Sequence, residues 1–140
     1  MSNARATWAE LGALIGLSAP AAAERVRKLE ESGVIKGYAA LIDPDSIGCG
    51  LAALISLTIE NPEYRPAIIK KIGELAEILD CHHVAGDVDY ILKVRCFGTR
   101  DLERLISNEI KSFPGVRTKT TVILSTIKET PVLPLSRGAE

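Results

Sequence analysis

Apolar residues recur at intervals of three and four near the start of the chain, which predicts a short amphipathic helix. The residues at this spacing are Trp8, Leu11, Leu14 and Ile15. Thr7 and Glu10 form a capping-box pattern at its start, and Gly16 is placed to end it. Ser18 is a favourable N-cap for a second helix that runs to about Ser32. Two helices joined by a short turn that begins with glycine are typical of a helix-turn-helix motif.

The second helix divides into an apolar stripe and a charged face. At about 100° per residue, Ala22, Val26 and Leu29 share one narrow stripe, which we expect to be buried. A recognition helix presents its N-terminal part to base edges in the major groove. The residues that would contact DNA from this helix are Ser18, Ala21, Glu24, Arg27 and Lys28. The alternating apolar residues of 34–42 predict a short extended wing, from which Lys36 would contact a phosphate.

The pattern after residue 50 predicts four strands and two helices. The expected strands are residues 51–59, 78–84, 89–97 and 116–127, and the expected helices are residues 66–76 and a segment capped by Thr99. The order β-α-β-β-α-β is that of a ferredoxin-like fold. The fold class is therefore α+β, with a winged helix-turn-helix domain in residues 1–43, a linker in 44–50 and the βαββαβ domain in 51–140.

Both helices of a βαββαβ unit cover one face of its sheet, and the other face is polar in a monomer. Here the first and last expected strands place apolar residues on both faces, such as Ile55 and Leu54, or Val122 and Ile123. A second apolar face has to be buried against something other than the two helices. We therefore expect a homodimer formed sheet to sheet.

Composition narrows the class of protein. The chain has 140 residues, of which 46% are hydrophobic and 25% charged, and its formal net charge is −1. No apolar run reaches the roughly 18 residues of a membrane-spanning helix, and no secretory signal pattern precedes the first helix. The three cysteines form no CxxC pair, which favours free thiols in a reducing cytoplasm. A near-neutral chain gives no electrostatic support for nucleic-acid binding, so an ordinary solvated surface remains an alternative for the charged helix face.

Two blocks of sequence together resemble the Lrp/AsnC (feast/famine) regulators. The first block comprises Gly16-Leu17-Ser18, Arg25-Val26, Leu29-Glu30 and Gly33-Val34-Ile35-Lys36-Gly37-Tyr38. The second comprises Gly86-Asp87-Val88-Asp89-Tyr90-Ile91-Leu92-Lys93-Val94 and Phe113-Pro114-Gly115-Val116-Arg117. The likeness extends from about Arg5 to Leu135.

The resemblance implies a cytoplasmic transcriptional regulator that is not an enzyme and has no cofactor or metal. Its partners would be promoter DNA and an amino acid or related metabolite, and its homodimers would assemble into tetramers or octamers. The effector would bind between dimers and alter assembly and promoter occupancy. The implied effector-binding residues are Gly86, Asp87, Asp89, Tyr90, Gly115, Thr118 and Thr120.

The residue types suit an amino-acid ligand. The carboxylate of Asp87 or Asp89 can pair with an α-ammonium group, and backbone amides near Gly115 can meet an α-carboxylate. The alternative for both aspartates is a plain hairpin turn, where Asp is favoured in any case.

The family's DNA-binding module normally begins with a further amphipathic helix, whereas almost nothing precedes Arg5 here. We therefore expect apolar residues of the two helices to be partly uncovered. These residues are Trp8, Leu11, Leu14 and Val26.

Two other functions remain as alternatives. One is an amino-acid-sensing or oligomerisation module without DNA binding. The other is an enzyme of the same architecture, such as a sirohaem decarboxylase, although the Arg- and Asn-containing motifs of those enzymes are missing. Metal-ligand residue types do gather in one region, at Cys81, His82, His83, Asp87 and Asp89. Without a second ligand pair, a partly buried structural histidine explains this cluster better than a metal site.

Overall fold

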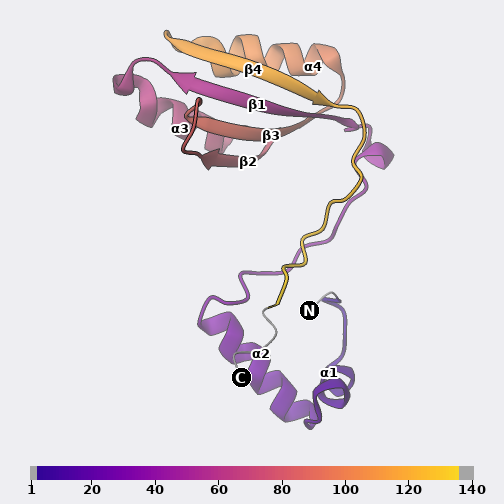
Figure 1. Cartoon of the computed structure of the whole chain (residues 1–140). Helices are drawn as coiled ribbons and strands as arrows, with labels where there is room; N and C mark the ends of the chain where they lie inside the picture. Colours follow the sequence, from indigo (N-terminus) through magenta and orange to yellow (C-terminus); the bar gives the residue numbers. More distant parts are fainter. Residues whose placement is uncertain (1–2, 136–140) are drawn as a thin grey trace. The chain divides into compact units, whose positions relative to one another are not determined.

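The computed structural model describes residues 3–135. The chain divides into two compact units, drawn in Figure 1. The first comprises residues 3–42 together with residues 129–135 of the described chain, and the second is Asp43–Lys128. None of the helices in the described residues is long and apolar enough to cross a membrane.

The first unit contains the two predicted helices, α1 (Trp8–Ile15) and α2 (Ala19–Glu31). The capping box of α1 is confirmed: the Thr7 hydroxyl accepts from the Glu10 amide at 3.2 Å, and the Glu10 carboxylate accepts from the Thr7 amide at 3.1 Å. Gly16 closes α1 in the left-handed conformation, with φ 72°. The Ser18 hydroxyl caps α2 by accepting from the Ala21 amide at 3.3 Å.

Gly12 brings the turn between the two helices close to α1. The Leu17 amide donates to the Gly12 carbonyl at 2.8 Å. A Cβ atom at position 12 would lie 2.4 Å from the Leu17 carbonyl oxygen, which is closer than any side chain tolerates. The helix-turn-helix geometry therefore depends on the missing side chain at this position.

Little of the first unit is buried. Within its described residues only Gly12 and Ala22 are fully buried. The expected exposure of α1 is confirmed, since Trp8 is 45% and Leu14 82% exposed. The expected burial of Leu29 is wrong: it is 41% exposed. At 1.5 Å per residue, the eight-residue α1 is about 12 Å long and cannot cover all of α2.

The predicted wing does not form as a strand. Residues 34–42 carry no strand pairing. A strand needs a hydrogen-bonded neighbour, and no described segment pairs with these residues. Val34 and Leu41 are exposed as a result.

The second unit has the predicted ferredoxin-like order. Its strands are β1 (Leu51–Ile59), β2 (Ile78–His83), β3 (Tyr90–Cys96) and β4 (Val116–Ile123). Its helices are α3 (Arg65–Glu74) and α4 (Thr99–Arg104), and α4 continues through a π turn (Leu105–Glu109) and a 3₁₀ turn (Ile110–Ser112). Two short 3₁₀ turns, Asp45–Ile47 and Pro62–Tyr64, complete the unit. The antiparallel sheet has the order β2-β3-β1-β4.

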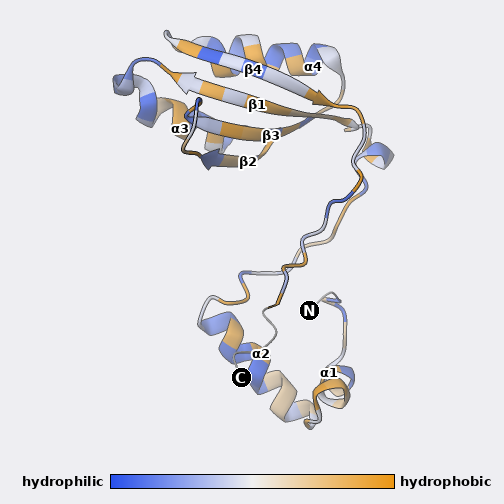
Figure 2. Ribbon diagram, viewed as in Figure 1, coloured by the Kyte–Doolittle hydropathy of each residue, from blue (hydrophilic) through white to orange (hydrophobic). Residues whose placement is uncertain are grey.

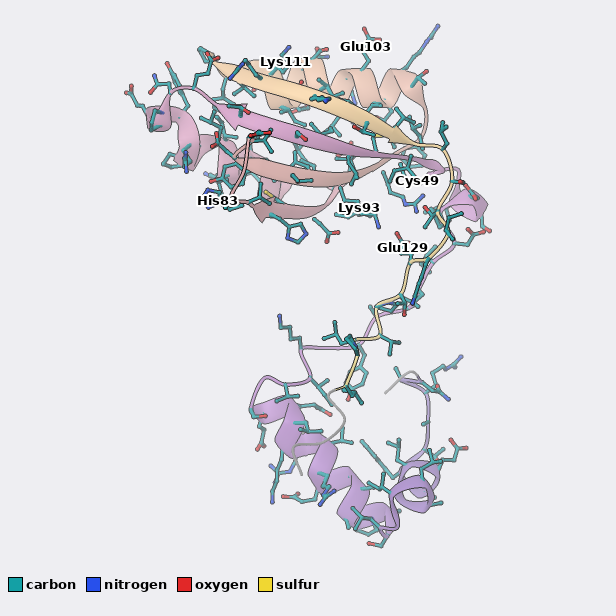
Figure 3. All side chains as sticks on the ribbon, viewed as in Figure 1. Cys49, His83, Lys93, Glu103, Lys111 and Glu129 are labelled. Atoms are coloured by element: carbon teal, nitrogen blue, oxygen red, sulfur yellow. The ribbon has the colours of Figure 1, made fainter. Side chains whose placement is uncertain are left out.

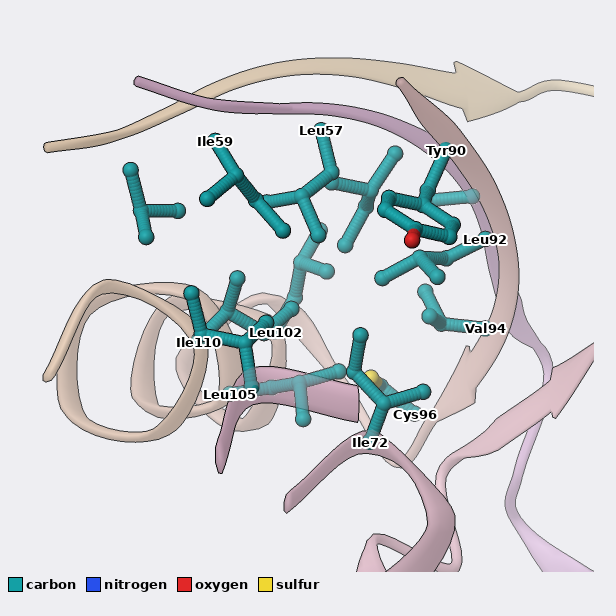
Figure 4. Packing of buried hydrophobic residues seen from close by; sticks show 14 residues of the cluster. Leu57, Ile59, Ile72, Tyr90, Leu92, Val94, Cys96, Leu102, Leu105 and Ile110 are labelled. Atoms are coloured by element: carbon teal, nitrogen blue, oxygen red, sulfur yellow. The ribbon is translucent and has the colours of Figure 1, made fainter. Parts of the chain in front are cut away.

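The core lies between the sheet and the helices (Figure 4). Alternate residues of the two central strands point into it, among them Ile55 and Leu57 of β1 and Leu92 of β3, each with no exposed surface. The helical segments contribute residues such as Ile68 and Leu105. Full burial of one such side chain stabilises a fold by about 1.5–3 kcal/mol, so this cluster is the main source of stability for the unit.

The opposite face of the sheet is mixed rather than apolar. The pairing register places polar and charged residues of β1, β3 and β4 there, such as Ser56, Lys93 and Lys119. Four apolar residues on that face form a diagonal across the strands: Ile123, Ala52, Leu54 and Ile91.

The last strand is shorter than expected. It ends at Ile123, which pairs with Ala52 near the beginning of β1. Only Leu51 of β1 lies beyond this point, so β1 is too short to pair with a strand that runs to residue 127. Leu124 and Ile127, expected in the strand, are more than 90% exposed. The cap of the last helix also differs, because Gly98 precedes α4 and Thr99 is its first residue.

The substitution Gly12→Ala tests the turn geometry. Helix propensity alone predicts a stabilisation of about 1 kcal/mol, whereas the clash with the turn predicts a destabilisation of about 1–3 kcal/mol. We expect destabilisation, measured by urea unfolding followed through the fluorescence of Trp8, the single tryptophan of the chain. Gly37→Ala is the control, since a Cβ atom there meets nothing within 4 Å. A stabilised Gly12→Ala protein would contradict the close approach.

Candidate functional site

The residues predicted to contact DNA lie along α2 and the segment after it. Glu24, Arg27 and Lys28 are exposed on the outer face of α2. Ser18 is the N-cap, and Ala21 is half-buried in the first turn. The sixth residue, Lys36, is exposed in the irregular segment 34–42.

The charges on the outer face of α2 are paired with one another. Arg27 donates to Glu24 through Nε at 3.0 Å and through Nη2 at 2.5 Å, and its Nη1 donates to Glu31. Lys28 Nζ lies 4.0 Å from Glu24. The hydrogen bond from Arg27 lowers the pKa of the Glu24 carboxyl, and the same bond raises the pKa of Arg27. Both groups are therefore charged at neutral pH.

The first set of predicted effector residues lies in the connection between β2 and β3. The Val84 amide donates to the Asp89 carbonyl at 3.0 Å and closes the connection. The Asp89 carboxylate accepts from the Ile59 amide at 2.8 Å, and the backbone amide of Asp89 donates to the Leu57 carbonyl at 3.0 Å. Asp89 therefore ties the connection to β1, whereas Asp87 is exposed.

The second set lies where β4 begins. The Glu60 amide donates to the Gly115 carbonyl at 2.9 Å. Gly115 has φ 72°, and a Cβ atom there would lie 3.4 Å from the Glu60 Cβ. Thr118 is paired with Leu57 and Thr120 with Ile55, and both threonines are half-buried.

The strand β1 separates the two sets. Tyr90, Leu57 and Thr118 form one row across three strands, with Leu57 in the middle. At about 4.8 Å between neighbouring strands, the backbones of Tyr90 and Thr118 are about 9.6 Å apart. The structure thus places both sets at the same end of the sheet but as two patches rather than as one enclosed pocket.

Two hollows of the surface lie away from both sets. One of about 250 Å³ is lined by residues of the first unit that include Trp8, Val26 and Tyr38. Another of about 310 Å³ lies on α4 and the following turn, beside Arg100 and Asn108. Neither includes a predicted effector residue.

Sequence reasoning missed several polar residues near the two patches. Arg117 Nε donates to Glu60 at 2.8 Å beside Gly115. On the other side, the His83 ring stacks on the Tyr90 ring at 4.8 Å, and the Arg65 guanidinium lies 5.8 Å from the same ring. The pattern along the chain gives no sign of these contacts, because they join residues of different segments, including Arg65 at the beginning of α3.

The region of possible metal ligands contains no metal-binding group. Within the described residues, no cluster of three or more His, Cys, Asp or Glu side chains could hold an ion. His83 is engaged with Tyr90, and Asp89 with the Ile59 amide. His83 is the last residue of β2, and Figure 3 labels its side chain.

Each of the two units matches a known family of protein domains. Residues 52–133 match the profile of the Lrp/AsnC ligand binding domain, and residues 1–36 match a winged helix-turn-helix DNA-binding profile. The chain belongs to the Lrp/AsnC family. It is a DNA-binding transcriptional regulator with a ligand-binding domain.

Curated relatives support this assignment. The chain is 38% identical over 125 residues to the HTH-type transcriptional regulator LrpA of Mycobacterium tuberculosis, a match that covers 89% of this chain and 83% of the relative. It is 33% identical over 130 residues to the leucine-responsive regulatory protein of Escherichia coli, covering 91% and 79%.

Solved structures share the fold. A transcriptional regulator from Neisseria meningitidis in complex with L-methionine has a TM-score of 0.89 and 29% identity, and the match covers 94% of this chain and 87% of that one. A feast or famine regulatory protein from M. tuberculosis, also complexed with L-methionine, has a TM-score of 0.82 and 37% identity, with 94% and 88% covered.

Replacing the two aspartates separately distinguishes their roles. Asp89→Ala leaves the Ile59 amide without its acceptor, which costs about 1.5–3 kcal/mol of unfolding free energy for a hydrogen bond to a charged group. Asp87→Ala removes an exposed side chain and changes stability by less than about 0.5 kcal/mol. Urea unfolding followed by far-UV circular dichroism measures both. Equal stability of the two variants would show that the hydrogen bond with the Ile59 amide does not contribute to the free energy of unfolding.

Proposed function

We propose that α2 of this regulator contacts promoter DNA and that an amino acid bound by the second unit changes promoter occupancy. The observation that carries the proposal is the pair of patches at one end of the sheet, in a chain that also bears a capped helix-turn-helix. Both units match the corresponding parts of a family of regulators.

On the DNA side, the proposal assigns contacts by position along α2. Ser18 and Ala21, in the first turn, would face base edges or sugars, with Glu24 one turn further. Arg27 and Lys28 would neutralise phosphates, and Lys36 would contact the backbone beside the groove.

On the effector side, the proposal assigns the α-ammonium group to Asp87. The Asp89 carboxylate is already hydrogen-bonded to the Ile59 amide of β1. Asp87 is exposed, so we assign its carboxylate to the ligand. Backbone amides near Gly115 and the hydroxyls of Thr118 and Thr120 would take the α-carboxylate. The relatives from N. meningitidis and M. tuberculosis were solved with L-methionine, which supports an amino acid as the ligand class.

The two patches do not meet within one chain, because Leu57 lies between them. We infer that a second copy completes the site. Dimers would pack through the open face of the sheet, where the apolar diagonal includes Leu54 and Ile91, and would then assemble into tetramers or octamers. A ligand held between dimers stabilises one assembly over another, and this linkage changes the spacing of the DNA-binding units.

Fluorescence anisotropy on duplex DNA from upstream of the chain's own gene tests the proposal. We expect binding that weakens with salt and responds to a member of an amino-acid panel. Arg27→Ala/Lys28→Ala should lower the slope of log K against log[salt] by about 0.9 for each phosphate contact that it removes.

The matched control is Lys70→Ala/Lys111→Ala, which removes two exposed positive charges from the second unit. Its slope should stay near that of the unchanged protein. Equal slopes for the two double variants would show that the face of α2 is wrongly assigned. Amino-acid binding without any DNA binding would favour the sensor module instead.

A further inference from the structure

The charged side chains on the outer face of α2 pair with one another. Arg27 lies between Glu24, three residues before it, and Glu31, four residues after it, and is hydrogen-bonded to both. These spacings bring side chains together on a helix surface. With Lys28 beside Glu24, the four side chains sum to zero charge. In Figure 2 the C-terminal half of α2 is largely hydrophilic, while its beginning is apolar.

This pairing changes what Arg27 can offer to DNA. Each of the three guanidinium nitrogens already donates to a carboxylate, which uses three of the five N–H groups. A phosphate would have to take the remaining two N–H groups beside the bound carboxylates or displace one of them. In both cases it would stand next to carboxylates of the same charge.

We propose that Glu24 and Glu31 are specificity determinants, which compete with phosphates for Arg27 and so suppress binding to DNA of arbitrary sequence. This inference rests on the proposed function, in which α2 faces the DNA. It assigns the two glutamates a task opposite to that of the basic residues: they weaken the sequence-independent part of binding.

A base edge can satisfy the paired charges where a phosphate cannot. Guanine offers two acceptors, O6 and N7, to an arginine, and cytosine offers its N4 amine to a carboxylate. A G·C pair can therefore replace the partners of both Arg27 and Glu24 at once. Specific binding survives the pairing, whereas binding through phosphates alone is reduced.

The chain offers a control of equal charge. Glu30 lies on α2 but accepts from the Tyr38 hydroxyl at 3.1 Å, whereas the hydrogen bonds of Arg27 go to Glu24 and Glu31. Glu10 belongs to the capping box of α1, where glutamine also serves. Glu10→Gln/Glu30→Gln therefore raises the net charge by the same amount as Glu24→Gln/Glu31→Gln and leaves the Arg27 pairs intact.

The test measures binding of the full chain to a random-sequence duplex between 50 and 200 mM salt. Freeing Arg27 for one phosphate contact should steepen the salt slope by about 0.9, which is about a 3.5-fold larger loss of affinity over this range. We expect this for Glu24→Gln/Glu31→Gln relative to Glu10→Gln/Glu30→Gln. Identical slopes and affinities in the two variants would overturn the proposal.

A second comparison separates release of Arg27 from simple repulsion between glutamates and DNA. In an Arg27→Ala background, Glu24→Gln/Glu31→Gln has no guanidinium to release, so its added slope should disappear. A slope that steepens equally without Arg27 would mean that the glutamates only repel phosphates, and the proposal would be wrong.

Heparin chromatography distinguishes failure of this inference from failure of the proposed function. If none of the proteins binds any duplex, the DNA-binding function is wrong. The pairing is still tested, because heparin is a polyanion without bases. Glu24→Gln/Glu31→Gln should then elute at higher salt than Glu10→Gln/Glu30→Gln, and elution at the same salt would contradict the pairing.

Discussion

The placement of β1 between β3 and β4 is the constraint on which the second unit depends. Its inward side chains are the centre of the core, and its two edges are both occupied by hydrogen-bonded neighbours. Because Leu57 pairs with Tyr90 on one side and with Thr118 on the other, the register of β1 fixes where the two predicted effector patches lie. The Asp89 carboxylate on the Ile59 amide holds one patch at that end of the sheet.

The two units are stabilised in different ways. The second has a contiguous buried core, whereas the described part of the first buries only Gly12 and Ala22 completely. The helix-turn-helix therefore relies on local devices: two N-caps, a capping box and a turn that closes on Gly12. Its outer face is organised by ion pairs among exposed side chains. Such pairs add little to stability. The effect that we propose for them is on what α2 can bind.

Local sequence patterns predicted the elements well, because caps and apolar spacing act within one helix or strand. The capping box at Thr7 and the extent of β1 are examples. The expected end of β4 was wrong, and residues 34–42, expected as an extended wing, carry no strand pairing, since a strand exists only where a partner is in register. The candidate site was harder to predict than the elements. Which aspartate is exposed depends on the hydrogen bond that the Asp89 carboxylate accepts from Ile59, thirty positions earlier. No pattern along the sequence predicts that contact.

The most direct measurement of the central claim is sedimentation velocity of the full chain with and without L-methionine or L-leucine, at several protein concentrations. If two copies complete the effector site, the ligand shifts the distribution of assemblies, and Asp87→Ala abolishes that shift while keeping the fold. A monomer that binds the amino acid with the same affinity at every protein concentration would contradict the account, because one chain would then hold a complete site.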